Sequence, residues 1–447
     1  MRESFDIVVR NDKYTLTVKL LYSVSIILLI VWVMNIVPSL FQWRINQVDH
    51  DVIPKTIEFS CNNISVPNGS ESDLASVLHK IYSPISKTSV QKYQLRYSLE
   101  ENRLEKLYDS LGVNKTVKTF LNYGHRTIFR PMNFSKCHAS KCAVITDMNR
   151  WREADALILT EDKVPNGIRP PEQLWFSLIE ESPVHIAMAG TLENEINYTI
   201  SFRLDSTIYS PYGSYEPYMK HHGPETRYPL PSRNFATGKS KKVAWFVSNC
   251  MPYSPRMTYA NELSRYIPLD IYGHCGTLSC PKYISTDTSS VSCLKMIREN
   301  YKFYLSFENS LCSEYITEKL YKNALKNDLL PIVMGASIEE YERVAPPYSF
   351  IHVDQFESPA KLAHYLKYLD ENDTAYNEYF AWHGHGIIHD YDAQPQCAMC
   401  LLAHTSHSFG PYWVPSVARW WNDGCNGRKL RWNPRNMNIE NRNIVLL

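Results

Sequence analysis

The alternation of apolar and polar positions is clearest between residues 301 and 335, where it predicts a strand, a turn, a helix and a second strand. Tyr301–Phe307 mixes aromatic residues with leucine, as buried strands do, and the polar residues Glu308–Ser310 end it. Apolar residues then recur on one helical face: Ile316, Leu320, Tyr321, Ala324 and Leu325. Leu329–Met334 forms the second strand. The pattern therefore predicts a β-α-β unit, which binds ligands in the crevice beyond the carboxyl ends of its strands.

A second unit of the same kind is predicted from residue 241. Val243–Ser248 and Leu269–Tyr272 read as strands, with an amphipathic helix between them. Arg256 stands at the entry of that helix, and a helix N-terminus beside a guanidinium binds anionic phosphate well. Further along, Ser349–Val353 is an expected strand, and Ser358 is the expected N-cap of a helix that has proline at its first position.

The first half of the chain shows short apolar runs between polar turns, which predict the strands of an α/β domain. These runs are Thr127–Arg130, Cys142–Thr146, Ala156–Thr160, His185–Ala189 and Tyr198–Arg203. The segment Gln173–Pro183 places Glu180 and Glu181 at the end of a strand or helix, beside Trp175. A carboxylate desolvated in this way can act as a general base, and an ordinary exposed glutamate pair is the alternative. Residues 209–233 are expected to connect two domains.

The amino-terminal part predicts a membrane anchor. Leu20–Val37 is an uncharged run of 18 residues, long enough for a helix to cross a thin bilayer. Basic residues are denser before this run than after it, which keeps the amino terminus cytosolic. A cleaved signal peptide is the alternative, but no small-x-small cleavage site follows. A polar, serine-rich stretch up to about residue 115 then reads as a stem.

The composition of the chain predicts its cellular compartment. The 447 residues are enough for two domains, and the net charge of +1 without a dense basic run gives no electrostatic case for a nucleic-acid partner, so none is expected. The odd count of 11 cysteines allows five disulfides and one thiol in an oxidising compartment. Six glycosylation sequons agree with a lumenal protein: Asn63, Asn68, Asn114, Asn133, Asn197 and Asn372. Together with the anchor, these features predict a single-pass protein of the secretory pathway.

Several motifs between about Thr116 and Cys400 resemble the α1,3-fucosyltransferases of the Golgi, glycosyltransferase family 10. They are Gln173 and Trp175 with Glu181-Ser-Pro183, Phe202-Arg-Leu-Asp-Ser206 with Pro211-Tyr-Gly213, Val243-Ala-Trp-Phe-Val-Ser-Asn-Cys250 with Arg256, Asp270-Ile-Tyr-Gly-His-Cys-Gly276, and Tyr301–Ser310 with Tyr315-Ile-Thr-Glu-Lys319. The last motif is the most specific.

The resemblance implies a fold and a domain order. It implies the GT-B architecture, in which two Rossmann-like α/β domains face a cleft, here preceded by a single transmembrane helix and a stem. The expected parts are a cytosolic tail (1–19), the anchor (20–37), the stem (38–115), an acceptor-side domain (116–235), a GDP-fucose-binding domain (236–396) and a C-terminal tail (397–447). Such an enzyme is a type II protein of the Golgi membrane with a lumenal catalytic domain.

The resemblance also implies an activity. Enzymes of this family transfer L-fucose from GDP-fucose, with inversion, in α1,3 linkage to N-acetylglucosamine of glycans. Glu181 would be the general base. Arg256 would neutralise the diphosphate with help from Lys319, Glu318 would hold ribose or fucose hydroxyls, and Asn309 and Tyr315 would contact the nucleotide sugar.

Alternatives remain for the acceptor and for the activity. Within the family, the acceptor is the N-acetylglucosamine of Lewis-type antennae or the innermost one of the N-glycan core. Outside it, the chain would be a glycosyltransferase for another nucleotide sugar, or a lumenal carbohydrate-binding protein without turnover.

A divalent-metal site has to be considered at Asp390-Tyr-Asp392, which follows His383, His385 and His389. The resemblance points instead to cationic side chains at the diphosphate, with no metal ligand and no essential cofactor, although a divalent cation can stimulate.

The cysteines suggest three short-range disulfides. The resemblance suggests a local bridge between Cys397 and Cys400. Cys275 and Cys280 flank a loop and form a second candidate pair, and spacing favours Cys137 with Cys142. The residues after Cys400 either pack back over the first domain or form a disordered extension.

Overall fold

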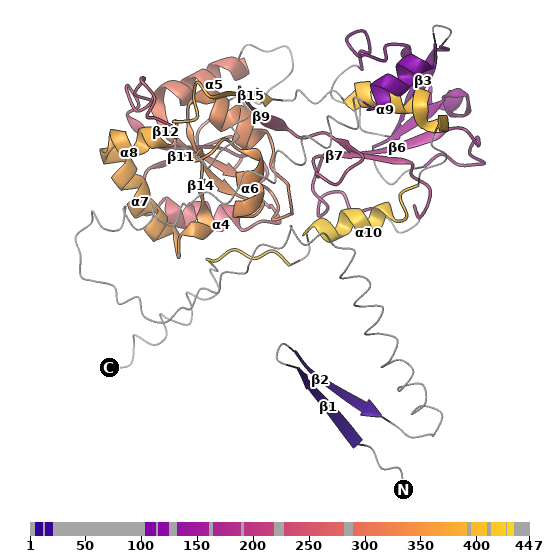
Figure 1. Ribbon diagram of the computed structural model, residues 1–447. Coiled ribbons are helices and arrows are strands. Elements are labelled where there is room, and N and C mark those ends of the chain that lie inside the picture. Colours follow the sequence, from indigo (N-terminus) through magenta and orange to yellow (C-terminus); the bar gives the residue numbers. More distant parts are fainter. Residues whose placement is uncertain are drawn as a thin grey trace. The chain divides into compact units, whose positions relative to one another are not determined.

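The computed structural model describes residues 5–11, 14–20, 103–112, 115–124, 132–160, 164–188, 192–218, 228–280, 289–390, 395–408, 413–425 and 427–432. The chain divides into two compact units, Met1–Asp73 and Leu74–Leu447. In the first unit, β1 (Phe5–Asn11) pairs antiparallel with β2 (Tyr14–Leu20) (Figure 1). No helix among the described residues is long and apolar enough to cross a membrane. The expected anchor beyond Leu20 and most of the expected stem lie outside the described residues.

The second unit contains two parallel sheets, which confirms the α/β class. The sheet later in the sequence has five strands in the order β11-β10-β12-β13-β14, all parallel. The strands are β10 (Lys241–Phe246), β11 (Leu269–Tyr272), β12 (Tyr301–Phe307), β13 (Leu330–Met334) and β14 (Ile351–His352). Each one was predicted, with ends that differ by up to two residues. The strand order reverses between β10 and β12, which makes their carboxyl ends the expected ligand site.

Side-chain alternation explains why this sheet is covered on both faces. Val243 and Trp245 enter one apolar cluster and Ala244, between them, enters another. The helices are α4 (Arg256–Leu263), α7 (Pro359–Glu371) and α8 (Asp373–Glu378) on the first face, and α5 (Ser289–Asn300) and α6 (Ile338–Val344) on the second. The expected cap of α7 is present, because the Ser358 hydroxyl accepts a hydrogen bond from the Lys361 amide at 3.3 Å.

The helix predicted after Glu308 is present but is not a regular α-helix. Residues Lys319–Ala324 form a π-helix, η3, and Leu325–Asn327 continue as a 3₁₀ turn, η4. The run ends at Asp328, whose backbone is left-handed with φ of 54°. π turns are rare and recur at functional sites, and this one begins at a candidate ligand-binding residue.

The earlier sheet has six parallel strands in the order β4-β3-β5-β6-β7-β8. They are β3 (Lys118–Tyr123), β4 (Cys142–Ile145), β5 (Ala156–Leu159), β6 (Leu174–Ile179), β7 (Tyr198–Ser201) and β8 (Ile208–Tyr209). The order again reverses between the first and third strands, so the two sheets share one winding pattern.

Three predicted strands of this sheet are confirmed, those beginning at residues 142, 156 and 198. The prediction for His185–Ala189 is wrong: the amides of His185 and Ile186 both donate to the Ser182 carbonyl, so this stretch turns tightly after β6. The predicted strand at 127–130 lies outside the described residues.

The end of the chain completes the cover of this earlier sheet. Helix α9 (Pro395–Thr405) packs its apolar residues against one face, beside β3 in Figure 1. Helix α10 (Val417–Asn422) packs on the other face, where Trp421 is fully buried and its indole donates to the Ile186 carbonyl at 2.7 Å. The described residues from Leu401 to Cys425 therefore pack back over the first domain, whereas Leu430 and Trp432 pack into the core of the later sheet. The domain limits along the chain stay predictions.

Ten cysteines form five disulfides, as the count allowed, but the predicted pairings are wrong. Cys397 and Cys400 do not bond to each other, Cys275 does not bond to Cys280, and Cys137 does not bond to Cys142. The observed pairs are Cys137–Cys397, Cys142–Cys400, Cys250–Cys275, Cys280–Cys293 and Cys312–Cys425. Two of them hold α9 to the sheet. Bonds between distant segments leave no trace in local spacing, which explains the error. The eleventh cysteine, Cys61, lies outside the described residues.

The sequons differ in their surroundings. Asn197 is only 3% exposed and its side-chain oxygen accepts from Arg169 and from the Trp175 amide, so the prediction of a glycan there is wrong for the folded protein. Asn133 is exposed and Asn372 caps α8. These two stay predictions, as do Asn63, Asn68 and Asn114, which lie outside the described residues.

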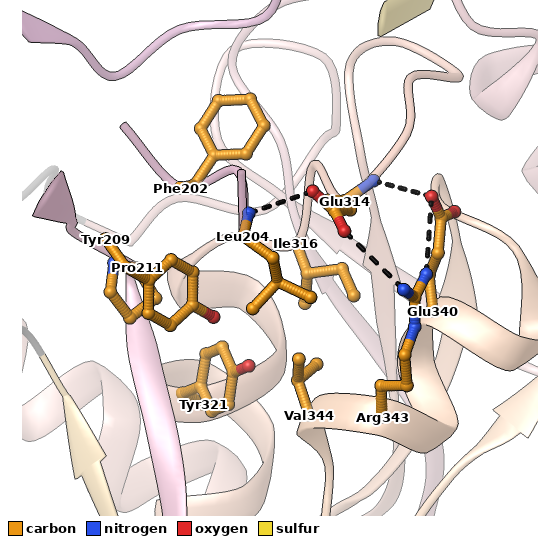
Figure 2. A pocket seen from close by; sticks show the side chains of 10 residues that line it. All are labelled: Phe202, Leu204, Tyr209, Pro211, Glu314, Ile316, Tyr321, Glu340, Arg343 and Val344. Atoms are coloured by element: carbon orange, nitrogen blue, oxygen red, sulfur yellow. Dashed lines mark hydrogen bonds and ion pairs between the residues drawn. The ribbon is translucent and has the colours of Figure 1, made fainter. Parts of the chain in front are cut away.

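Loops of the two sheets meet around a small pocket (Figure 2). Phe202, Leu204, Tyr209 and Pro211 line it from the earlier sheet; Glu314, Ile316, Tyr321, Glu340, Arg343 and Val344 line it from the later one. The Leu204 amide donates to the Glu314 carboxylate at 3.0 Å, and Arg343 lies 3.7 Å from the same carboxylate. The two parts of the unit are therefore joined by polar contacts and by apolar packing.

We expect Trp421→Ala to lower the free energy of unfolding by about 3–5 kcal/mol, because it removes the largest buried side chain of α10 and leaves a cavity against the sheet. Urea denaturation followed by circular dichroism measures this. Arg419→Ala, an exposed position on the same helix, is the control and should change stability by no more than about 0.5 kcal/mol. Equal effects of the two substitutions would contradict the packing role of α10.

Candidate active site

Arg256 joins the two strand ends at the reversal point of the later sheet. Its guanidinium donates to the carbonyl oxygens of Phe307, which ends β12, at 3.0 Å and of Asn249, just beyond β10, at 2.9 Å. The residue is 4% exposed, and its Nε has no hydrogen-bond partner among the described residues. Burial lowers the pKa of Arg256, an effect that the carboxylate of Glu308 opposes. Arg256 thus holds the expected crevice together, in the place where the sequence predicted a cation.

A cluster of charged and polar groups surrounds Glu308, the residue that follows β12. Its carboxylate accepts from the Thr317 amide and hydroxyl, both at 2.9 Å, and from Lys319 Nζ at 2.9 Å. Lys319 also lies 3.3 Å from the Glu318 carboxylate. Glu308 is 1% exposed, whereas the side chain of Glu318 is 33% exposed. Lys319 is therefore held between an inner carboxylate and an outer one.

Burial and charge act in opposite directions on these groups. Burial raises the pKa of Glu308, and Lys319 opposes that shift. Burial by itself would lower the pKa of Lys319, but Glu308 and Glu318 together raise it well above the ordinary value. Burial by itself would raise the pKa of Glu318, but the positive charge of Lys319 outweighs this effect, and the pKa is lowered. The lysine therefore carries its positive charge, and the outer carboxylate its negative charge, at neutral pH.

Glycine at position 335 makes this packing possible. A Cβ atom on Gly335 would lie 2.7 Å from Glu308 Cγ and 3.2 Å from the Tyr341 hydroxyl. Any larger residue would push Glu308 away from Thr317 and Lys319. The backbone after β13 thus forms one wall of the cluster.

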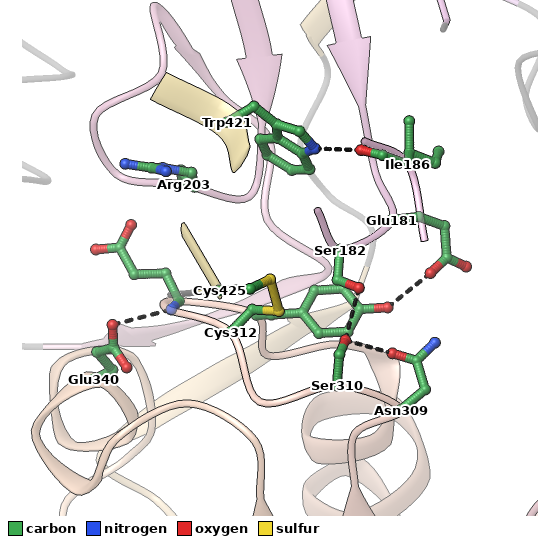
Figure 3. Close-up of a disulfide and its surroundings, with 12 residues drawn as sticks. Glu181, Ser182, Ile186, Arg203, Asn309, Ser310, Cys312, Glu340, Trp421 and Cys425 are labelled. Carbon is green, nitrogen blue, oxygen red and sulfur yellow. Dashed lines mark hydrogen bonds between the residues drawn. A yellow bond between two sulfur atoms is a disulfide. The ribbon is translucent and has the colours of Figure 1, made fainter. Parts of the chain in front are cut away.

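Glu181 follows the earlier sheet and meets residues that follow β12 of the later sheet (Figure 3). It lies just beyond β6, half-buried, and its Oε2 accepts a hydrogen bond from the Tyr315 hydroxyl at 3.0 Å. The adjacent Ser182 is bonded through its hydroxyl to that of Ser310 at 2.6 Å, and Ser310 donates to Asn309 Oδ1 at 2.8 Å. Two neighbouring residues of one sheet are therefore fixed by two residues of the other.

Tyr315 is built into the core beneath the earlier sheet. It is 2% exposed, and its ring centroid lies 5.1 Å from that of Phe202. Burial raises its pKa well above the ordinary value, so its hydroxyl keeps the proton that it donates to Glu181. The disulfide Cys312–Cys425 lies three residues away and ties the same loop to the turn after α10 (Figure 3).

The structure brings the predicted site residues into one region, in two groups. Glu318 and Lys319 lie together around Glu308, while Asn309 and Tyr315 lie at the contact with Glu181. Glu308 and Ser310 were expected at the ligand-binding end of the strand without an assigned role, and Ser182 and Thr317 were missing from the predicted site. Glu308 had a signal in the sequence, because it follows a buried strand directly. The same signal applied to Ser310, whereas Ser182 and Thr317 had none. The roles assigned to all these residues stay predictions.

The triplet at Asp390 does not gather a metal site among the described residues. Asp390 is the last residue of β15 (Gly386–Asp390), which pairs with β9 (Gly213–Pro217), and Tyr391 and Asp392 lie outside the described residues. His389 bonds to Glu216 at 2.8 Å and Asp390 bonds to Lys326, so the two side chains have separate partners. The metal-type cluster that the described residues do contain is Cys142, Cys400 and His404, whose two sulfurs are bonded to each other.

Comparisons with known proteins agree with this arrangement of two parts. Residues 115–213 match the sequence family "Fucosyltransferase, N-terminal", and residues 236–420 match "Glycosyltransferase family 10 (fucosyltransferase) C-term". Together these matches cover more than half of the chain and confirm the resemblance noted from the motifs.

Individual relatives carry related names. Glycoprotein 3-alpha-L-fucosyltransferase A of Drosophila melanogaster is 39% identical over 294 residues, and 4-galactosyl-N-acetylglucosaminide 3-alpha-L-fucosyltransferase FUT5 of Homo sapiens is 38% identical over 252. The matches span 64% and 55% of this chain and only 56% and 63% of those relatives. A crystal structure of an alpha1,3-fucosyltransferase with GDP-fucose superposes with a TM-score of 0.42 at 14% identity, over 70% of this chain and 98% of that one.

We expect Lys319→Met to lower the free energy of unfolding by about 3–5 kcal/mol, because it leaves the buried Glu308 carboxylate without a cation. Thermal and urea unfolding measure the loss. The double variant Glu308→Gln with Lys319→Met should regain part of it, since neither charge is then buried alone. Lys295→Met, at an exposed position of α5, is the control. Additive losses in the double variant would contradict the pairing of these residues.

Proposed function

Because this chain belongs to glycosyltransferase family 10, the fucosyltransferases, we propose that it transfers L-fucose from GDP-fucose, with inversion, to N-acetylglucosamine of glycans in α1,3 linkage. The observation that carries the proposal is the meeting of Glu181 with Tyr315 beside the cluster around Lys319. One sheet supplies a carboxylate and the other supplies charged groups at its ligand-binding edge.

Inversion needs a single displacement at the anomeric carbon of fucose. The acceptor hydroxyl attacks from one side while the diphosphate leaves from the other, so a base is required on one side and positive charge on the opposite side. Glu181 has one carboxylate oxygen occupied by the Tyr315 hydroxyl. We assign its other oxygen, Oε1, to the proton of the acceptor hydroxyl. Tyr315 fixes the direction in which that oxygen points.

The later sheet forms the donor side of the proposal. Lys319 is positively charged and lies at the carboxyl edge of the sheet, where it would face the diphosphate. The outer carboxylate of Glu318 suits sugar hydroxyls, which are hydrogen-bond donors. Asn309 lies at the strand end beside these groups. Arg256 would neutralise the diphosphate through its positive charge, and its two carbonyl contacts hold the loops of the donor side in place.

Fold and location follow from the same proposal. Two sheets with one winding order, joined at their loops, support a GT-B architecture with the active site between them. The five disulfides support a lumenal catalytic part, and we propose a single-pass type II protein of the Golgi membrane. No essential metal is part of the mechanism, because cationic side chains stand at the donor side; a divalent cation would only stimulate.

The proposal leaves two acceptors, the N-glycan core and Lewis-type antennae. The relative from Drosophila melanogaster is named for glycoprotein acceptors, and the human one for 4-galactosyl-N-acetylglucosaminide. Their identities to this chain, 39% and 38%, do not choose between core and Lewis-type acceptors. Both acceptors share a pyranose ring whose hydroxyl is presented to Glu181, and the mechanism is the same for either.

We expect Glu181→Gln to lower kcat by about a hundredfold to ten-thousandfold, because the amide cannot accept the acceptor's proton. The Kd for GDP-fucose should be unchanged, since Glu181 belongs to the other sheet. Initial rates with a panel of glycans, and calorimetric titration with GDP-fucose, measure the two quantities. The neighbouring Glu180→Gln is the control and should keep its activity.

Near-normal turnover by Glu181→Gln would remove the proposed base. Binding of UDP-sugars in preference to GDP-fucose by the wild type would favour a different glycosyltransferase. Binding of glycans without any transfer by the wild type would favour a carbohydrate-binding protein.

We expect Tyr315→Phe to lower kcat by about tenfold to a hundredfold while the KM for GDP-fucose stays within twofold, roughly the cost of misplacing a catalytic group by an ångström. The phenyl ring preserves the packing on Phe202 but no longer orients Glu181. Tyr376→Phe is the matched control, because that buried hydroxyl donates to the Lys302 carbonyl at the opposite edge of the sheet. A raised KM for GDP-fucose without a loss of kcat would instead make Tyr315 a ligand of the donor.

A further inference from the structure

Two large apolar side chains stand exposed in the loop between β10 and α4. Met251 is 91% exposed and Tyr253 is 70% exposed, although the loop belongs to the reversal point of the later sheet. Exposed apolar side chains are common singly, but two in one short loop beside a catalytic region call for an explanation. Val184, three residues beyond Glu181, adds a third exposed apolar side chain from the earlier sheet.

The loop that carries Tyr253 is rigidly held. The next residue, Ser254, is 4% exposed; its hydroxyl donates to the Glu308 carbonyl at 2.7 Å and its amide donates to the Asn309 carbonyl at 2.9 Å. On the other side, Cys250 is bonded to Cys275. A side chain presented by such a loop loses little conformational freedom when a ligand covers it, which favours binding.

Tyr253 also meets the segment that carries the proposed base. Its ring lies edge-to-face against the imidazole of His185, with centroids 5.1 Å apart and an angle of 75°. His185 follows Glu181 by four residues, and its Nε2 is buried without a hydrogen-bond partner among the described residues. A closed path of contacts therefore runs from Tyr253 through Ser254, Asn309, Ser310 and Ser182 to Glu181.

We propose that Tyr253, supported by His185 and flanked by Met251 and Val184, forms a stacking platform for a pyranose ring of the acceptor glycan. This inference rests on the proposed function, because it uses Glu181 as the point at which the acceptor hydroxyl must lie. Sugar rings have an apolar face of C–H groups and a rim of hydroxyls, so they pack flat against an exposed aromatic ring. Tyr253 is exposed, it contacts His185 four residues after the proposed base, and the bonds of Ser254 fix its loop to the end of β12.

The chemistry favours a glycan over other occupants. The donor's phosphates require cations, and none of the four platform residues is a lysine or an arginine. The donor sugar must lie beside the cluster of Lys319 and Glu318 instead. An acceptor of more than one sugar extends away from Glu181. The sugar next to the reacting one would then pack on Tyr253, which belongs to the donor-side sheet.

Steady-state kinetics of the full chain test the platform. Wild type, Tyr253→Ala, Tyr253→Phe and Tyr266→Ala are compared with GDP-fucose and whichever of N-acetyllactosamine or a trimannosyl-core glycopeptide the wild type fucosylates. Tyr253→Ala should raise the KM for the acceptor about three- to tenfold, the range expected for losing one aromatic contact. Tyr253→Phe should restore it. Tyr266→Ala is the control, since Tyr266 is another exposed tyrosine, 40% exposed, near the amino end of β11.

The donor parameters separate the platform from other roles. The KM for GDP-fucose and the slow hydrolysis of GDP-fucose without acceptor should be the same in all four proteins. An unchanged acceptor KM in Tyr253→Ala, or a raised KM for GDP-fucose in its place, overturns the platform. If the wild type transfers fucose to neither glycan, the proposed function is wrong. If the wild type transfers fucose and Tyr253→Ala has the same acceptor KM, only the platform is wrong.

Discussion

A parallel sheet has to be covered on both faces, and this constraint shapes the whole molecule. The earlier sheet receives much of its cover from the far end of the chain, where α9 packs on one face and α10 on the other. The chain therefore passes through the later sheet and its helices before it returns. The earlier sheet cannot be treated as an independent domain of contiguous sequence, because its core includes residues from both ends of the second unit.

The return of the chain also helps to set the geometry of the candidate site. Helix α10 leads into Cys425, whose disulfide to Cys312 holds the loop from which Tyr315 enters the core. Tyr315 then reaches Glu181, and Ser310 reaches Ser182. The packing of α10 on the earlier sheet thus helps to fix the position of the Glu181 carboxylate. Each hydrogen bond is modest in energy, but the disulfide and the buried rings restrict the alternatives.

The strands of the later sheet were predictable because each is a short apolar run buried on both faces, and the cap at Ser358 was predictable from local chemistry. The site was predictable where function leaves a local motif, as at Glu318 and Lys319. It was not predictable where a role depends on a distant partner. Nothing near Tyr315 indicates that its hydroxyl meets Glu181, and nothing near Cys425 indicates Cys312. The strand assigned to 185–189 failed because apolar content alone does not distinguish a strand from a tight turn after one.

The two disulfides of α9 have a consequence for biosynthesis. Cys137 and Cys142 must wait for partners that follow them by 260 and 258 residues. In the lumenal location that we propose, the earlier half of the second unit would emerge with two open thiols and an uncovered apolar face before α9 is made. Its sheet can complete neither these two disulfides nor its apolar cover until α9 has been made. A premature stop before α9 would therefore remove the partners of both cysteines and the cover of a sheet encoded more than two hundred residues earlier.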